Sequence, residues 1–85
     1  MNFLKVCFKF KKDNSYEKSI EFYTKAIETN INSKKVAIFY SNRAFAHIKM
    51  ENYGLAISDA DEAIKIDAEY VKSYYRKADA SIALG

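Results

Sequence analysis

The 85-residue sequence contains no proline and no tryptophan, and it has only two glycines, one cysteine and one histidine. Because proline and glycine are the strongest interrupters of helices, their scarcity favours an all-α chain. Cys7 has no partner for a disulfide within the chain and stands in no metal-ligand spacing. We therefore expect buried structural roles for Cys7 and His47, and neither a bound metal nor another cofactor.

Long apolar runs and catalytic motifs are missing as well. No stretch approaches the roughly 20 apolar residues of a membrane span, and "MNFLKVCFKF" at residues 1–10 lacks the long apolar core and cleavage site of a signal peptide. The chain has no glycine-rich phosphate loop and no nucleophile arranged with a base. These absences predict a non-enzymatic domain that is located in the cytoplasm, with the nucleus as a second location, and that has no membrane partner.

Two stretches of the chain are repeated at spacings near 34 residues. "YEKSIEFYTKAIETN" matches "YGLAISDADEAIKID" at an offset of 37, through the pairs Tyr16/Tyr53, Ile20/Ile57, Ala26/Ala63 and Ile27/Ile64. "AIFYSNRAFAHIKM" matches "VKSYYRKADASIAL" at an offset of 34, through the pairs Tyr40/Tyr74, Arg43/Lys77, Ala44/Ala78 and Ile48/Ile82. The polar stretch "NINSKK" absorbs the difference as a lengthened turn. A pair of helices that recurs every 34 residues is typical of tetratricopeptide repeats.

Apolar spacing and polar breaks predict five helices, at about residues 3–12, 16–29, 35–50, 53–66 and 69–84. The first helix is expected to stop in "KDNS", where Asp, Asn and Ser compete for backbone hydrogen bonds, and Asp67 is expected to cap the fifth. Small residues are expected where helices approach closely, at Ala44, Ala56, Ala63 and Ala78.

This pattern resembles about two and a half tetratricopeptide repeats in a right-handed superhelix of antiparallel helix pairs. Repeat 1 would span about residues 1–33, repeat 2 about 37–70, and the first helix of repeat 3 about 71–85. In such folds the first helix of each pair lines a concave groove.

Charge is segregated by helix class. The three first-helix segments, 1–12, 34–50 and 70–85, carry a net charge of +10, and the remainder carries −7, which together give the net charge of +3. A basic groove with an acidic back predicts an anionic ligand on the concave side. The alternative is that these are ordinary solvated helix faces.

The repeat register places four polar residues in this groove: Asn42, Lys49, Lys72 and Arg76. A carboxylate has about four acceptor sites and is best held by several donors at once, such as a guanidinium, an ammonium and an amide NH2 group. Three apolar side chains, Ile38, Phe45 and Tyr75, are expected nearby and could contact aliphatic side chains of a peptide.

Asn42, Lys72 and Arg76 resemble the carboxylate clamp of co-chaperone tetratricopeptide domains. The segments "YSNRAFAHIKMENYGLAISDADEAIKID" and "YVKSYYRKADASIALG" are similar to the N-terminal domain of the protein phosphatase 5 family, over about residues 14–85. The resemblance implies binding of the acidic EEVD tail of a cytosolic heat-shock chaperone, with the ninety-kilodalton class favoured. It also implies a targeting and autoinhibitory role toward the chain's own serine/threonine phosphatase domain.

The first helix departs from this family, which supplies a Lys and an Asn four residues apart. Aligned without a gap, those places fall on Leu4 and Phe8, while Lys5 and Lys9 keep the spacing one residue along. Either a rotated or slipped helix lets both lysines bind the peptide, or this half of the clamp is weak.

Two alternatives to this reading remain. The domain could be an adaptor of another co-chaperone, or its basic groove could hold nucleic acid phosphates while Tyr75 and Phe45 stack on bases. Copies of the chain could also self-associate through the last helix, where Tyr74, Ile82 and Leu84 are expected to be partly uncovered, and light scattering tests this.

Overall fold

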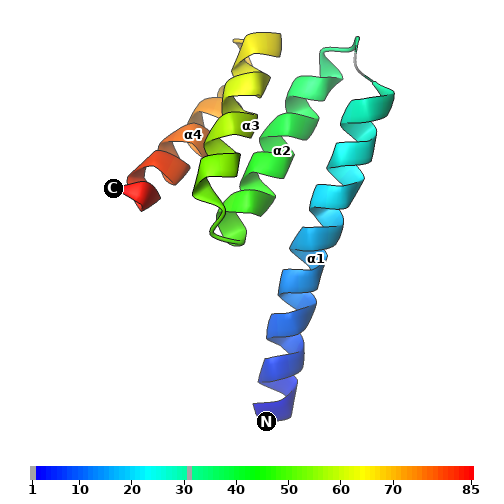
Figure 1. Cartoon of the computed structure of the whole chain (residues 1–85), viewed down its shortest axis with the longest axis vertical. Helices are drawn as coiled ribbons and strands as arrows, with labels where there is room; N and C mark the ends of the chain where they lie inside the picture. The colour runs from blue at the N-terminus through cyan, green and yellow to red at the C-terminus, as the bar shows by residue number, and fades with distance from the viewer. Residues whose placement is uncertain (1, 31) are drawn as a thin grey trace.

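The computed structural model describes the backbone of residues 2–30 and 32–85 and the side chains of residues 15–30 and 32–85. The described backbone forms helices without strands: α1 (Asn2–Thr29), α2 (Lys35–Lys49), α3 (Tyr53–Ile66) and α4 (Val71–Leu84) (Figure 1). The all-α prediction is confirmed, and the predicted number of five helices is wrong. Within the described residues, no helix is both long enough and apolar enough to cross a membrane.

The first two predicted helices are one helix in the structure. α1 is continuous for 28 residues and runs through the polar stretch that was expected to end it. Asp, Asn and Ser are weak helix formers, but each costs only about 0.5 kcal/mol relative to alanine, and neither proline nor glycine is present to break the helix. The expected antiparallel helix pair of the first repeat is therefore absent.

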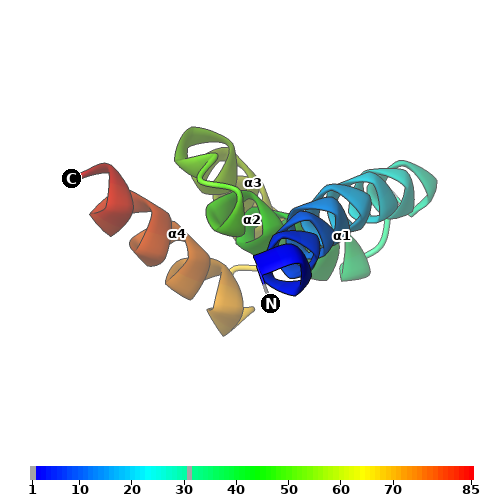
Figure 2. The same cartoon turned by 90° about the horizontal axis from the view of Figure 1, so that it is seen from below.

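Successive helices alternate in direction, and α2 is the central element (Figure 1). α2 contacts α1, α3 and α4, and α3 also contacts α4. Viewed from below, α2 and α3 lie between α1 on one side and α4 on the other (Figure 2). This arrangement puts one face of α2 within reach of both α1 and α4.

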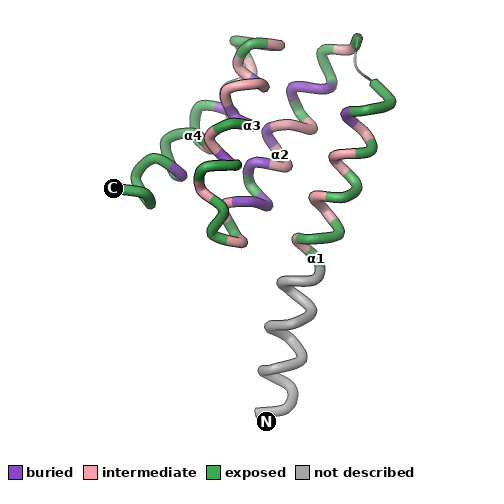
Figure 3. The backbone as a smooth tube through the Cα atoms, in the orientation of Figure 1, coloured by how far each residue is buried: buried purple, intermediate pink, exposed green. Residues whose placement is uncertain are grey.

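Alanines fill the interface between α2, α3 and α4. Ala44, Ala56, Ala60 and Ala80 are fully buried and form one cluster, against which Ile48, Tyr53 and Ile57 pack. Side chains this small let helix backbones approach closely. Buried positions accordingly lie on the facing sides of these helices (Figure 3).

The small-residue predictions are mostly confirmed. Ala44, Ala56 and Ala63 are fully buried, but Ala78 is exposed and Ala80 is buried in its place. Because residues rotate about 100° per position around a helix, Ala78 and Ala80 point to nearly opposite sides of α4. The side of α4 that carries Ala80 packs on the described core.

α4 carries several exposed apolar side chains. As predicted, Tyr74, Ile82 and Leu84 are uncovered, with Ile82 exposed by 78%. Self-association through these residues stays a prediction.

α2 ends in a tight backbone motif. Glu51 has φ of 63°, the backbone N–H of Asn52 donates to the His47 carbonyl at 2.8 Å, and the N–H of Glu51 donates to the Ile48 carbonyl at 3.0 Å. This pair of hydrogen bonds satisfies the last carbonyls of the helix.

Asp67 does not cap a helix that starts at Glu69. Its Oδ1 accepts a hydrogen bond from the Glu69 N–H at 3.1 Å, but α4 begins only at Val71. The Tyr74 hydroxyl donates to the Ala68 carbonyl at 2.8 Å and fixes the same turn. Asp67 thus orders the α3–α4 turn, and the predicted helix start is two residues early.

Candidate functional site

One face of α2 carries four of the predicted site residues. Ile38, Asn42, Phe45 and Lys49 recur at spacings of three and four residues, so they form one stripe along the helix. Ile38 and Phe45 are exposed although both are large and apolar, and Asn42 is half-buried. The stripe lies where α2 is flanked by α1 and α4.

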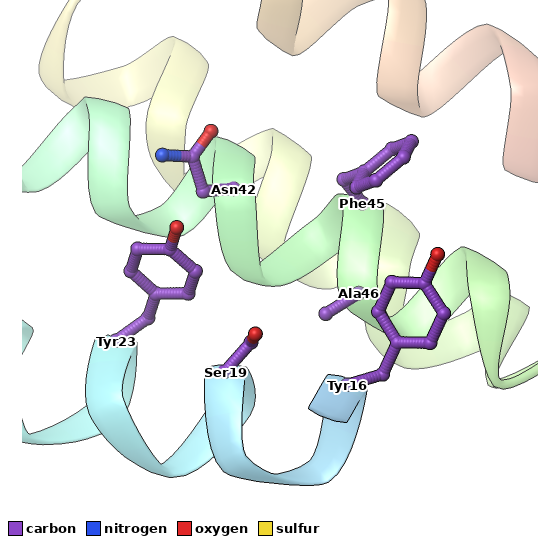
Figure 4. A pocket seen from close by; sticks show the side chains of 6 residues that line it. All are labelled: Tyr16, Ser19, Tyr23, Asn42, Phe45 and Ala46. Atoms are coloured by element: carbon purple, nitrogen blue, oxygen red, sulfur yellow. The ribbon is translucent and has the colours of Figure 1, made fainter. Parts of the chain in front are cut away.

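A pocket of about 230 Å³ lies between α1 and α2. Its walls are the side chains of Tyr16, Ser19 and Tyr23 from α1 and of Asn42, Phe45 and Ala46 from α2 (Figure 4). In Figure 4, Asn42 and Tyr23 stand at one end, Tyr16 and Phe45 stand at the other, and Ser19 and Ala46 lie between them. The pocket therefore combines aromatic surface with hydroxyl and amide groups.

Phe45 brings α1, α2 and α4 together beside this pocket. The guanidinium carbon of Arg76 lies 4.5 Å from the centroid of the Phe45 ring, and the Lys49 Nζ lies 5.3 Å from it. Tyr16 packs edge-on against the same ring, with centroids 6.5 Å apart. Two cations and two aromatic rings from three helices thus form one cluster, which we call the Phe45 cluster (Tyr16, Phe45, Lys49 and Arg76).

Lys72 lies on α4 one turn before Arg76, so the two side chains share a helix face. Within the described part of the chain, no carboxylate pairs with Lys72, Arg76 or Lys49. Tyr75 on α4 is 62% exposed and, like Ile38, stands outside the pocket wall. The side chains of Lys5 and Lys9 lie outside the described residues.

Arg43 does not contribute its charge to the predicted basic groove. Its Nε and Nη2 donate to the two oxygens of Asp59 at 2.8 and 2.7 Å, and its Nη1 donates to the Thr24 hydroxyl at 3.0 Å. The hydrogen bond to Asp59 is the main reason that the pKa of Arg43 is raised, against the opposing effect of burial. Arg43 therefore joins α1, α2 and α3 instead of facing a ligand.

Lys77 is also paired, with its Nζ 2.9 Å from the Asp61 carboxylate on α3. Counting charge by helix class therefore overestimates the positive charge of the groove. Two of the counted cations, Arg43 and Lys77, pair with acids of α3. Arg43 and Lys77 were not among the residues predicted to lie in the groove, and their ion pairs remove them from the positive charge available to a ligand.

His47 borders the Arg43–Asp59 pair. Its Nε2 lies 3.7 Å from the Asp59 carboxylate, and its Nδ1 lies 3.5 Å from the amide nitrogen of Asn52. Burial is the largest effect on its pKa and lowers it, while Asp59 acts in the opposite direction. The predicted structural role of His47 agrees with these surroundings.

Three α1 residues of the pocket were not among the predicted site residues. Tyr16, Ser19 and Tyr23 follow a spacing of three and four residues, which places them on one helix face. That spacing was the available signal, but the repeat register directed attention to first helices only. Among the described residues, no group of three or more potential metal ligands converges.

Comparison with known proteins identifies a repeat within the described helices. Residues 37–70 match the tetratricopeptide repeat family. This match shows that the chain contains a tetratricopeptide repeat, and the consecutive antiparallel helices agree with it.

The chain is similar to several longer proteins. It is 46% identical over 74 residues to serine/threonine-protein phosphatase 5 of Homo sapiens, a match that covers 87% of this chain and 14% of that protein. It is 44% identical over 72 residues to a protein SGT1 homolog of Oryza sativa subsp. japonica, covering 85% of this chain and 19% of that protein. It is 38% identical over 77 residues to protein unc-45 homolog B of Xenopus laevis, covering 91% and 8%. The chain spans less than a fifth of each of these relatives.

Proposed function

We propose that the chain is a protein-interaction domain that binds the acidic C-terminal EEVD-type peptide of a cytosolic heat-shock chaperone. The observation that carries the proposal is the Phe45 cluster, in which Arg76 and Lys49 converge beside a pocket that contains Asn42. These cations have no carboxylate partner among the described residues, so an anionic ligand would neutralise them.

The donor set suits a carboxylate. Arg76 offers a guanidinium fork, Lys72 an ammonium group one turn away, and Asn42 an amide NH2 group. Lys49 adds positive charge at the edge, and the exposed Ile38, Phe45 and Tyr75 offer apolar surface to peptide side chains. Lys5 and Lys9 are included in the proposal as further contacts to the peptide.

The parent protein is proposed to be a phosphatase 5-like serine/threonine phosphatase in which this domain targets and inhibits its own catalytic domain, in the cytoplasm or the nucleus. The similarity to phosphatase 5 supports this proposal. The similar levels of identity to SGT1 and unc-45 homologues keep an adaptor of another co-chaperone as the second candidate.

Isothermal titration with two peptides tests the binding proposal. One peptide ends in EEVD with a free carboxylate, and the other has the same sequence with an amidated terminus. We expect the free-acid peptide to bind at least tenfold more tightly, because amidation removes the terminal negative charge and replaces one of the two acceptor oxygens with an NH2 donor. Equal affinity for both peptides, or tighter binding of a single-stranded oligonucleotide with steep salt dependence, would contradict the proposal.

A further inference from the structure

Phe45 has a second structural relation to the proposed ligand, through the side chain of Arg76. The guanidinium carbon of Arg76 lies 4.5 Å from the Phe45 ring centroid, well within the range of about 6 Å for an attractive cation–π contact. The two residues come from different helices, α2 and α4, so this contact also spans the helix interface. Phe45 itself remains 36% exposed.

The environment of Arg76 restricts how its guanidinium can point. The Nε atom is enclosed and has no hydrogen-bond partner among the described residues, whereas neither terminal nitrogen is enclosed in this way. Among the described residues, the guanidinium contacts the ring of Phe45. Its terminal N–H groups can therefore donate hydrogen bonds to a ligand.

We propose that Phe45 is a positioning residue that holds Arg76 ready to receive a carboxylate. This inference rests on the proposed function. A free arginine side chain loses much rotamer freedom when it binds a ligand, and a contact already present in the free protein reduces that loss. The two interactions are compatible, because a ring attracts the guanidinium through its face and a carboxylate binds the N–H groups in the guanidinium plane.

The lysine of the cluster strengthens this reading. Lys49 lies one turn after Phe45 on α2, and its Nζ is 5.3 Å from the same ring. Two like charges near one ring repel each other, and an anion beside them relieves that repulsion. Phe45 thus contacts two cations from different helices at the end of the pocket where it lies beside Tyr16 of α1.

Substitutions at Phe45 separate the ring from its apolar volume. Phe45→Leu keeps an apolar side chain but removes the ring face, and we expect it to weaken binding of the free-acid EEVD peptide about fivefold. Phe45→Tyr keeps the ring and is expected to bind within about twofold of wild type. Phe22→Leu is the matched control, because Phe22 is also an exposed aromatic residue but lies on α1, outside the pocket wall.

A double-mutant cycle tells positioning from direct contact with the ligand. The loss of affinity caused by Phe45→Leu is expected to be much smaller in the Arg76→Ala background than in wild type, because most of the effect of Phe45 acts through Arg76 and only the rest comes from its own apolar contact with the peptide. NMR of the free protein gives a second readout: the Arg76 side-chain resonances are expected to carry a ring-current shift that Phe45→Leu removes and Phe45→Tyr retains.

Unchanged peptide affinity in Phe45→Leu would overturn the inference, as would an equal loss in the wild-type and Arg76→Ala backgrounds. Failure of the wild-type protein to bind the peptide would instead overturn the proposed function. In that event the NMR comparison still decides whether Phe45 holds Arg76, and the absence of a ring-current shift in the wild type would refute the contact itself.

Discussion

Arg43 on α2 and Arg76 on α4 belong to helices that the repeat pattern treats as equivalent, yet the structure uses them differently. Arg43 makes two hydrogen bonds to the buried carboxylate of Asp59 on α3. Arg76 lies over the Phe45 ring and has no carboxylate partner among the described residues. The comparison teaches that the nearest acid, rather than the helix that carries the cation, decides whether an arginine serves folding or remains for a ligand.

The largest effect is expected on stability, from removing the side chain of Arg43. Arg43→Ala leaves Asp59, which is only 6% exposed, without its charge partner. Removing one member of a buried ion pair costs about 3 to 5 kcal/mol, and we expect about 3 kcal/mol because the Arg43 side chain is 20% exposed. Urea denaturation followed by circular dichroism measures this loss of unfolding free energy.

Lys77→Ala is the matched control for Arg43→Ala. The Lys77–Asp61 pair also joins helices, but both side chains are nearly half exposed, so its loss should cost less than about 0.5 kcal/mol. If Arg43→Ala lowered the unfolding free energy no more than Lys77→Ala does, the claim that Arg43 stabilises the fold through Asp59 would be wrong.

Substituting Arg76 is expected to reduce peptide affinity and to have little effect on stability. Arg76→Ala should weaken binding of the EEVD peptide about tenfold, because a hydrogen bond to a charged group contributes roughly 1.5 to 3 kcal/mol. Lys72→Ala should have a similar effect, Asn42→Ala a smaller one, and Lys49→Ala a smaller one again.

Stability measured on the same samples sharpens this prediction. Arg76 makes no ion pair with a described residue, and its contact with the partly exposed Phe45 ring contributes only about 0.5 to 1 kcal/mol, so Arg76→Ala should lower the unfolding free energy by at most about 1 kcal/mol. Calorimetric titration paired with thermal melts gives both quantities. A stability loss large enough to explain the weaker binding would return Arg76 to a structural role.

The stability of the region around the Arg43–Asp59 pair should also depend on pH, because His47 borders this pair. Burial lowers the pKa of His47 in the folded protein below its ordinary value of about 6.5, so the unfolded chain takes up the proton more readily. The contribution of neutral His47 is fully present above about pH 6.5 and is lost as the pH falls through that value toward the folded pKa. We expect the melting temperature to fall between pH 7 and pH 5.

His47→Asn supplies the control for the pH experiment, because asparagine does not titrate. Its melting temperature should vary less over the same pH range. A wild-type curve that is flat between pH 7 and pH 5, or a His47→Asn curve that is equally steep, would contradict the prediction.

The smallest effect is expected from substituting Lys65, which lies on α3 and belongs neither to the pocket wall nor to the Phe45 cluster. Lys65 is 78% exposed and pairs with Glu62 one turn away on α3. Lys65→Ala should change peptide affinity by less than about twofold and stability by less than about 0.5 kcal/mol. A larger loss of affinity, measured by the same titration, would mean that overall charge and not the Phe45 cluster governs binding.

Much of the fold could be predicted because its signals are local. The predicted range of α3, residues 53–66, agrees with the structure, and α2 ends one residue earlier than predicted. The break in the first helix was predicted wrongly, because the helix propensities of Asp13, Asn14 and Ser15 are too small to end a helix by themselves.

The site was harder to predict because its contacts are made between helices. The partner of Arg43 lies 16 residues along the chain, and its position depends on how α2 and α3 pack. The same holds for the contact between Phe45 and Arg76, which repeat register alone does not reveal. Register did place Asn42, Phe45 and Lys49 on one face, whereas Tyr16 and Tyr23 reach the pocket only through the packing of α1 on α2.

The central claim is that Arg76 receives the carboxylate of a peptide. Titration of wild type and Arg76→Ala with free-acid and amidated EEVD peptides tests it most directly, because the four affinities form a thermodynamic cycle. We predict that amidation weakens binding to wild type tenfold or more and weakens binding to Arg76→Ala by at most about threefold. An equal loss on amidation in both proteins would contradict the claim, because the terminal carboxylate and Arg76 would then act independently.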